Sequence, residues 1–268
     1  MEVFAAYMKN IIVVGSYEGV SGYSDISRGN SEYVSKELAS DINCVADISK
    51  KHGYKVYSFC PEAKESKYLF KYYANFLNEV ESVDSIGLKD IISDCIGVVL
   101  VGISAKAGTI NAFLDKTYKD SWWKYSINGK ESGLFNIFST FFAINNIPVI
   151  LMSGCYAACI EAKNENDDVL IVETKRGIEN NRNMADCIPV NIVREKLSCA
   201  MEQALTNINK YKINKVLLPV KINIEFIRED YLEDTLFINK NLDLDRIGAR
   251  VIEKNIYNTN DIKDFLIQ

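Results

Sequence analysis

The chain has 268 residues, which is enough for one large or two smaller domains with a sizeable hydrophobic core. Hydrophobic residues make up 48% of the sequence and charged residues 25%, the composition of an ordinary globular protein. The formal net charge of −5 provides no basic field for nucleic acid or an anionic membrane surface, so we expect neither as a partner.

The apolar runs, the first residues and the cysteines bear on where the protein resides. The apolar runs are much shorter than the roughly 20 residues of a membrane-spanning helix. The first residues lack a basic segment followed by an apolar core, so no signal peptide is expected. The seven cysteines are an odd number without paired spacing, which favours reduced thiols over disulfides. We therefore expect a cytoplasmic protein.

Short apolar runs alternate with segments of helical periodicity along most of the chain. The apolar runs predict strands at 11–14, 54–59, 98–101, 148–152 and 169–172. Helices are predicted from Ser31 to Gly53 and around residues 68–77, and a further strand at 122–127 should turn at Asn128-Gly129. This alternation is typical of an α/β fold with a largely parallel central sheet flanked by helices.

The pattern changes after a helix predicted over roughly 190–209. From Val220 to Phe226, apolar and polar residues alternate, which indicates a strand that is exposed on one face. We therefore predict an α/β core domain over residues 1–195 and a smaller α+β region over residues 196–268. Because no Gly/Ser-rich linker separates them, the two parts should pack tightly.

The single histidine, His52, limits the chemistry that the protein can perform. Zinc hydrolysis and most general-base catalysis near neutral pH use imidazole groups, and one imidazole cannot supply a site that needs several. His52 also precedes Gly53 at the predicted end of a helix, where a cation and a glycine are commonly found. We interpret His52 as a structural residue.

Five short segments occur in an order that matches one known family. They are Val13–Gly22, Gly102–Thr109, Phe113–Thr117, Ile127–Glu131 and Pro148–Gly154. Together they resemble segments of the M55 family of D-aminopeptidases, zinc-dependent enzymes that remove D-residues from the amino end of peptides. The resemblance covers nearly the whole chain and implies the family's fold. It also implies a homo-oligomer, with two stacked pentameric rings forming a decamer as the family arrangement.

The resemblance fails at the family's metal and catalytic positions. The first bridging aspartate falls on Ser16, a second aspartate on Cys60, and histidines on Glu62, Ser104 and Lys116, of which the family uses the last in catalysis. A glutamate ligand falls on Leu134, two further acids fall on Cys155 and Tyr156, and Glu18 alone keeps its identity. Serine and leucine do not replace zinc ligands. Glu18 and Glu62 could hold one hard cation, but two carboxylates are a sparse site, and we expect no metal and no cofactor.

The retained glycines predict that the pocket persists with different polar residues. Lys116 is interpreted as an electrostatic stabiliser or a base, or else as an ion-pair partner of Glu18 or Glu62 that fills the place of a lost cation. Cys60 is a candidate nucleophile, or else a small buried hydrophobe. With Glu62 and Asp115 these residues form the candidate catalytic set. The other candidate pocket residues are Glu18, Ser16, Ser104, Lys106 and Cys155.

Two functions remain open at this point. The first is metal-independent amide hydrolysis or acyl transfer on a peptide or aminoacyl substrate, which the retained pocket and its new reactive residues favour. The second is a non-catalytic relative that binds a peptide or an amino acid, or that partners an active homologue. Both predict a peptide or aminoacyl small molecule as the ligand. The sequence does not decide between them, because it does not show whether Cys60, Glu62 and Lys116 converge.

Overall fold

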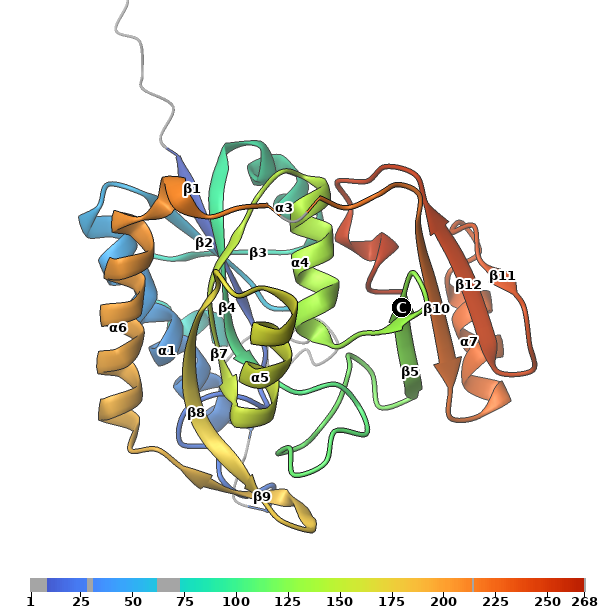
Figure 1. Cartoon of the computed structure of the whole chain (residues 1–268), viewed down its shortest axis with the longest axis horizontal. Helices are drawn as coiled ribbons and strands as arrows, with labels where there is room; N and C mark the ends of the chain where they lie inside the picture. Colours follow the sequence, from blue (N-terminus) through green and yellow to red (C-terminus); the bar gives the residue numbers. More distant parts are fainter. Residues whose placement is uncertain (1–8, 28–30, 62–72, 214, 268) are drawn as a thin grey trace, which may run out of the picture.

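A seven-stranded sheet forms the centre of the computed structural model, which describes residues 9–27, 31–61, 73–213 and 215–267 (Figure 1). The strand order is β3-β2-β1-β4-β7-β8-β9, and every neighbouring pair is parallel except β8 with β9. The strands are β1 (Asn10–Gly15), β2 (Lys55–Phe59), β3 (Glu81–Val83), β4 (Cys95–Ile103), β7 (Val149–Cys155), β8 (Leu170–Ile178) and β9 (Asn181–Cys187). The predicted largely parallel sheet is confirmed.

Helices cover both faces of this sheet, which explains why its central strands are continuous apolar runs. Two helices, α1 (Ser31–Lys51) and α6 (Val190–Thr206), pack together on one face, and α4 (Leu134–Ile144) and α5 (Tyr156–Glu165) lie on the other (Figure 1). The short helix α3 (Ser85–Ile91) follows β3. None of the helices in the described part of the chain is long and apolar enough to cross a membrane.

The end of the first helix lies close to the position that the sequence predicts. The first helix ends near His52, whose ring Nε2 lies 2.8 Å from the Glu202 carboxylate of α6, and Gly53 takes the left-handed conformation expected of a helix stop (φ +82°). These positions support the structural interpretation of His52. The first half of the helix predicted around residues 68–77 lies outside the described residues, and residues 73–75 are helical.

A second, antiparallel sheet has the strand order β11-β12-β10-β5-β6. Its strands are β5 (Trp122–Ile127), β6 (Lys130–Glu131), β10 (Val220–Phe226), β11 (Asp245–Arg246) and β12 (Val251–Ile256). The Asn128-Gly129 hairpin is present as predicted, with both residues at positive φ. The hairpin pairs with β10, so residues before and after position 195 share one sheet. The domain boundary near 195 stays a prediction.

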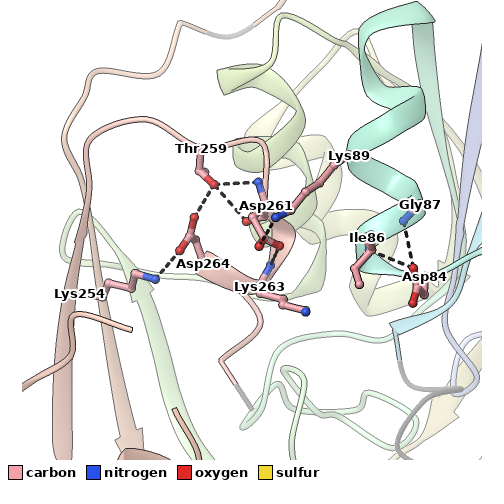
Figure 2. Close-up of polar contacts among 9 residues, drawn as sticks. All are labelled: Asp84, Ile86, Gly87, Lys89, Lys254, Thr259, Asp261, Lys263 and Asp264. Carbon is pink, nitrogen blue, oxygen red and sulfur yellow. Dashed lines mark hydrogen bonds and ion pairs between the residues drawn. The ribbon is translucent and has the colours of Figure 1, made fainter. Parts of the chain in front are cut away.

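The end of the chain returns to the core between the two sheets. Figure 2 shows its polar contacts: Lys254 of β12 pairs with Asp264, and Lys89 of α3 lies 2.6 Å from Asp261. Beyond them Phe265 is fully buried, its carbonyl accepts a bond from the Tyr125 hydroxyl of β5 at 3.2 Å, and its ring packs edge-on against a phenylalanine of α4. These contacts link the second sheet to helix α4, which covers the first sheet. Helix α7 (Glu229–Ile238) follows β10 and packs against it.

Candidate functional site

The loops that follow β1 and β4 meet at the carboxyl edge of the main sheet, where open α/β sheets bind their ligands. The Gly19 amide donates to the Gly102 carbonyl at 2.8 Å. A side chain at Gly19 would meet the Ile103 carbonyl oxygen at 2.3 Å, and one at Gly102 would meet the Ser16 carbonyl oxygen at 2.2 Å. Only glycine permits this approach of two backbones. The loops therefore form a fixed platform for the side chains between them.

Glu18 and Lys116 form an ion pair on this platform. The Lys116 ammonium lies 2.6 Å from Oε1 of Glu18, and the Ser16 hydroxyl donates to Oε2 at 3.1 Å. The side chain of Lys116 is 20% exposed and that of Glu18 is 13% exposed, so the pair is partly shielded from water. Of the interpretations of Lys116, the structure therefore shows the ion pair, with Glu18 as the partner. Glu62, the other carboxylate of that prediction, lies outside the described residues.

The backbone of Lys116 is held from both sides by the loop after β4. Its amide donates to the Ala105 carbonyl at 3.0 Å, and the Ser104 hydroxyl donates to its carbonyl at 2.9 Å. Ser104, which is 1% exposed, therefore supports Lys116 rather than lining an open space. The side chain of Lys116 is aimed at Glu18 by this anchored backbone.

Asp115 braces the same loop. Its Oδ2 accepts a bond from the Gly108 amide at 2.7 Å, and its Oδ1 accepts one from Arg182 of β9, also at 2.7 Å. Leu114, directly before it, has a positive φ of 46°, which is strained for a branched side chain. The structure thus gives Asp115 a loop-bracing contact set, and its catalytic role stays a prediction.

Lys106 extends this bracing toward α4 and α5. Its amide donates to the Glu161 carboxylate of α5 at 3.1 Å, and its ammonium lies 3.1 Å from Glu131 of β6. The Thr109 hydroxyl donates to the other Glu161 oxygen at 2.7 Å. Burial raises the pKa of Glu161, a residue that the sequence analysis did not single out. Lys106 is therefore part of the rim of the platform.

Cys60 lies at the carboxyl end of β2 in a buried group of hydroxyls. It is 6% exposed, and it interacts with the side chains of Tyr17 and Tyr73. Burial is the main cause that raises the pKa of both phenols, and the nearby Cys60 raises it further. The Tyr73 hydroxyl also shares a hydrogen bond with Ser58. These surroundings suit the buried-thiol interpretation, and the nucleophile role stays a prediction.

Cys155 and Leu134 occupy two positions that carry acids in M55 enzymes. Cys155 ends β7, stands at the N-cap of α5 and is 1% exposed. Leu134 begins α4 and is also 1% exposed. Neither side chain has a carboxylate, so neither supplies the acid that the resemblance assigns to its position.

Lys175 of β8 is a site residue that the sequence analysis missed. Its side chain is fully buried, and its ammonium donates to the carbonyl oxygens of Glu18 at 2.9 Å and Tyr23 at 2.6 Å. Burial lowers the pKa of Lys175 to about 8. The surrounding sequence, Thr174-Lys175-Arg176, gave no signal, because a lysine near the end of a strand is ordinarily exposed.

These residues do not fit the zinc pair that the M55 resemblance implies. The Lys116 ammonium lies beside the Glu18 carboxylate, and a metal ion bound at the same oxygens would be repelled by that positive charge. Leu134 contributes only a buried hydrocarbon side chain. Across the ranges that the structure describes, no group of three or more His, Cys, Asp or Glu side chains is placed to hold a metal ion.

Comparisons with known proteins agree with the fold described above. The family model for Peptidase_M55, D-aminopeptidase, matches residues 85–264, well over half of the chain. The protein therefore belongs to the M55 family of D-aminopeptidases. Among solved structures, it is similar to the Zn-dependent D-aminopeptidase DppA from Bacillus subtilis, described as a self-compartmentalizing protease. The TM-score is 0.79 at 16% identity, over 96% of this chain and 94% of that one, which shows a shared fold. No curated protein matches.

The Lys116–Glu18 pair should make a measurable contribution to folding stability. We expect a double-mutant cycle with Lys116→Met and Glu18→Gln to give a coupling of about 1–3 kcal/mol, because the two charges lie in contact and are partly shielded from water. The exposed pair of Lys106 and Glu131 is the control, with an expected coupling below about 1 kcal/mol. Urea unfolding measures both, and equal couplings would contradict the assignment.

The buried Lys175 should make stability depend on alkaline pH. Its pKa in the folded protein is about 8 against an ordinary 10.5, so between these values the unfolded chain binds more protons. Stability contributed by this group should therefore rise with pH, by about 3 kcal/mol across that window. Wild type and Lys175→Met are compared by urea unfolding at each pH. A stability difference that stays constant from pH 8 to 10.5 would refute this.

Proposed function

We propose that this M55 protein has lost the family's dinuclear zinc site and uses the retained pocket to bind a peptide or an amino acid without metal-dependent hydrolysis. The observation that carries the proposal is the ion pair of Glu18 and Lys116 at 2.6 Å. An ammonium group there supplies the positive charge that a metal ion would otherwise bring to this carboxylate. The ligand class follows from membership of the family, whose substrates are peptides with a free amino end.

The electrostatics of the pair suit a zwitterionic ligand. A ligand ammonium can take the place of Lys116 beside Glu18, and the released Lys116 can pair with a ligand carboxylate or carbonyl oxygen. Glu18 and Lys116 then each exchange their present partner for a group of the ligand, so neither charge is left unpaired in a partly buried site. Ser16 keeps its bond to the second oxygen of Glu18 and holds the carboxylate in place.

This proposal predicts the metal content and the ligand response of the purified protein. We expect no stoichiometric zinc by elemental analysis and no cleavage of D-alanyl peptides with or without added zinc. Dipeptides with a free amino end should raise the melting temperature of the wild type, because a ligand of the folded state stabilises it. The shift should disappear in Glu18→Gln and persist in Lys124→Met, because Lys124 is an exposed residue of β5 outside the candidate site. Two zinc ions per chain, or zinc-dependent cleavage, would overturn the proposal.

A second candidate function is metal-independent amide hydrolysis or acyl transfer. The observation in its favour is the bond of the Ser16 hydroxyl to Glu18, with the Lys116 ammonium on the same carboxylate. A hydroxyl beside a carboxylate base and a cation is a possible nucleophile, and Cys60 is the alternative one. Slow turnover of an aminoacyl or peptide substrate without metal, abolished in Ser16→Ala or Cys60→Ala, would favour this candidate.

We also infer that the protein assembles from several copies and resides in the cytoplasm. Support for assembly comes from DppA, whose description as self-compartmentalizing implies a closed particle, and from exposed apolar side chains on α7, where Phe237 and Ile238 are 69% and 64% exposed. All seven cysteines are free thiols, which suits a reducing compartment. Light scattering should report a mass several times that of one chain. A monomer at micromolar concentration would contradict the assembly.

A further inference from the structure

The loop that carries Glu18 crosses the carboxyl edge of the sheet from β1 to β8. We call residues 16–23 the Glu18 loop. At its start the Ser16 amide donates to the Val101 carbonyl at 2.9 Å, and in its middle the Gly19 amide donates to Gly102. At its far side, two consecutive β8 residues bind its carbonyls: Thr174 donates to Gly19 at 2.7 Å, and Lys175 donates to Glu18 and Tyr23. The loop is therefore fixed from two separate strands.

Of the four contacts just described, the one made by Lys175 involves a full charge. Because that charge is buried, it is stable only with hydrogen-bond acceptors around it. The side chain is 0% exposed, and its ammonium lies 4.6 Å from the ring centre of Phe113 and 5.3 Å from that of Tyr23. An ammonium taken out of water requires hydrogen-bond acceptors. The two carbonyl oxygens meet that requirement only when the loop keeps its present path. Lys175 and the loop conformation are thus mutually dependent.

The groups that face Lys175 come from several elements. Cys155 of β7 and Cys187 of β9 are its cross-strand neighbours on either side. Asp41 of α1 also acts on it electrostatically, as does Glu18. Asp41 in turn accepts bonds from the amide and hydroxyl of Ser21 at 2.9 and 2.7 Å, so a second buried charge holds the same loop.

We propose that Lys175 is a positioning residue of the candidate site: by binding the carbonyl oxygens of Glu18 and Tyr23, it holds the Glu18 carboxylate within reach of Lys116. The clamped carbonyl belongs to the residue whose side chain forms the ion pair, so a shift of this peptide group moves the carboxylate directly. The proposal rests on the proposed function only in taking Glu18 and Lys116 as the site.

The test measures the Lys116–Glu18 coupling in three backgrounds: wild type, Lys175→Met and Lys254→Met. Lys254 of β12, in the second sheet, is the matched control, because it is also a buried lysine, 6% exposed, but it pairs with Asp264. We expect the coupling to fall to less than half of its wild-type value in Lys175→Met and to stay unchanged in Lys254→Met. A coupling that survives in Lys175→Met, or that falls equally in both, would overturn the proposal.

A second measurement applies if Lys175→Met does not fold. Thr174→Val removes the neighbouring donor to the loop while keeping the side-chain volume. Hydrogen exchange at the Gly19 amide should then accelerate at least tenfold, with exchange in β10 unchanged. Acceleration of similar size throughout the chain, or none at Gly19, would overturn the clamp from β8. Because no ligand enters either experiment, the outcome is independent of whether the pocket binds peptides.

Discussion

The ion pair between Lys116 and Glu18 is the interaction on which the rest of the site depends. The two residues come from the loops after β1 and β4, and the first of these loops approaches the end of β4 so closely that Gly19 and Gly102 cannot carry side chains. A carboxylate held on such a platform is partly shielded from water and needs a positive partner. Lys116 supplies that charge from within the chain, and Lys175 fixes the backbone beneath it.

The fold and the charge pattern together explain how the loops of this M55 protein keep their shape with the Lys116 ammonium beside Glu18. Backbone contacts and buried polar side chains shape the loops, with Ser104, Asp115 and Glu161 each engaged in bracing them. None of these contacts requires a bound cation. Changes at the centre of the site can therefore occur without loss of the surrounding structure. On this account the loop backbone is held independently of the few side chains at the centre of the site.

Much of the fold followed from the sequence, and the exceptions have physical causes. Central strands such as β4 are apolar throughout, and the Asn128-Gly129 turn has a distinctive backbone requirement, so both were predictable. Edge strand β9 was missed because its residues are mostly polar and exposed. The pairing of the Trp122–Ile127 strand with β10 joins segments far apart in the chain, and alternation shows which face is buried without naming the partner strand.

The site was partly predictable as well. An ion pair of Lys116 with Glu18 or Glu62 was one of two interpretations that the sequence offered for Lys116, and the structure shows the pair with Glu18. The buried Lys175 could not be recognised, because its acceptors are backbone carbonyls, which every residue has. A crystal structure of the protein grown with millimolar zinc tests the central claim most directly. The account predicts the Lys116 ammonium beside the Glu18 carboxylate and no metal at that position. Zinc coordinated by Glu18, with Lys116 displaced, would contradict it.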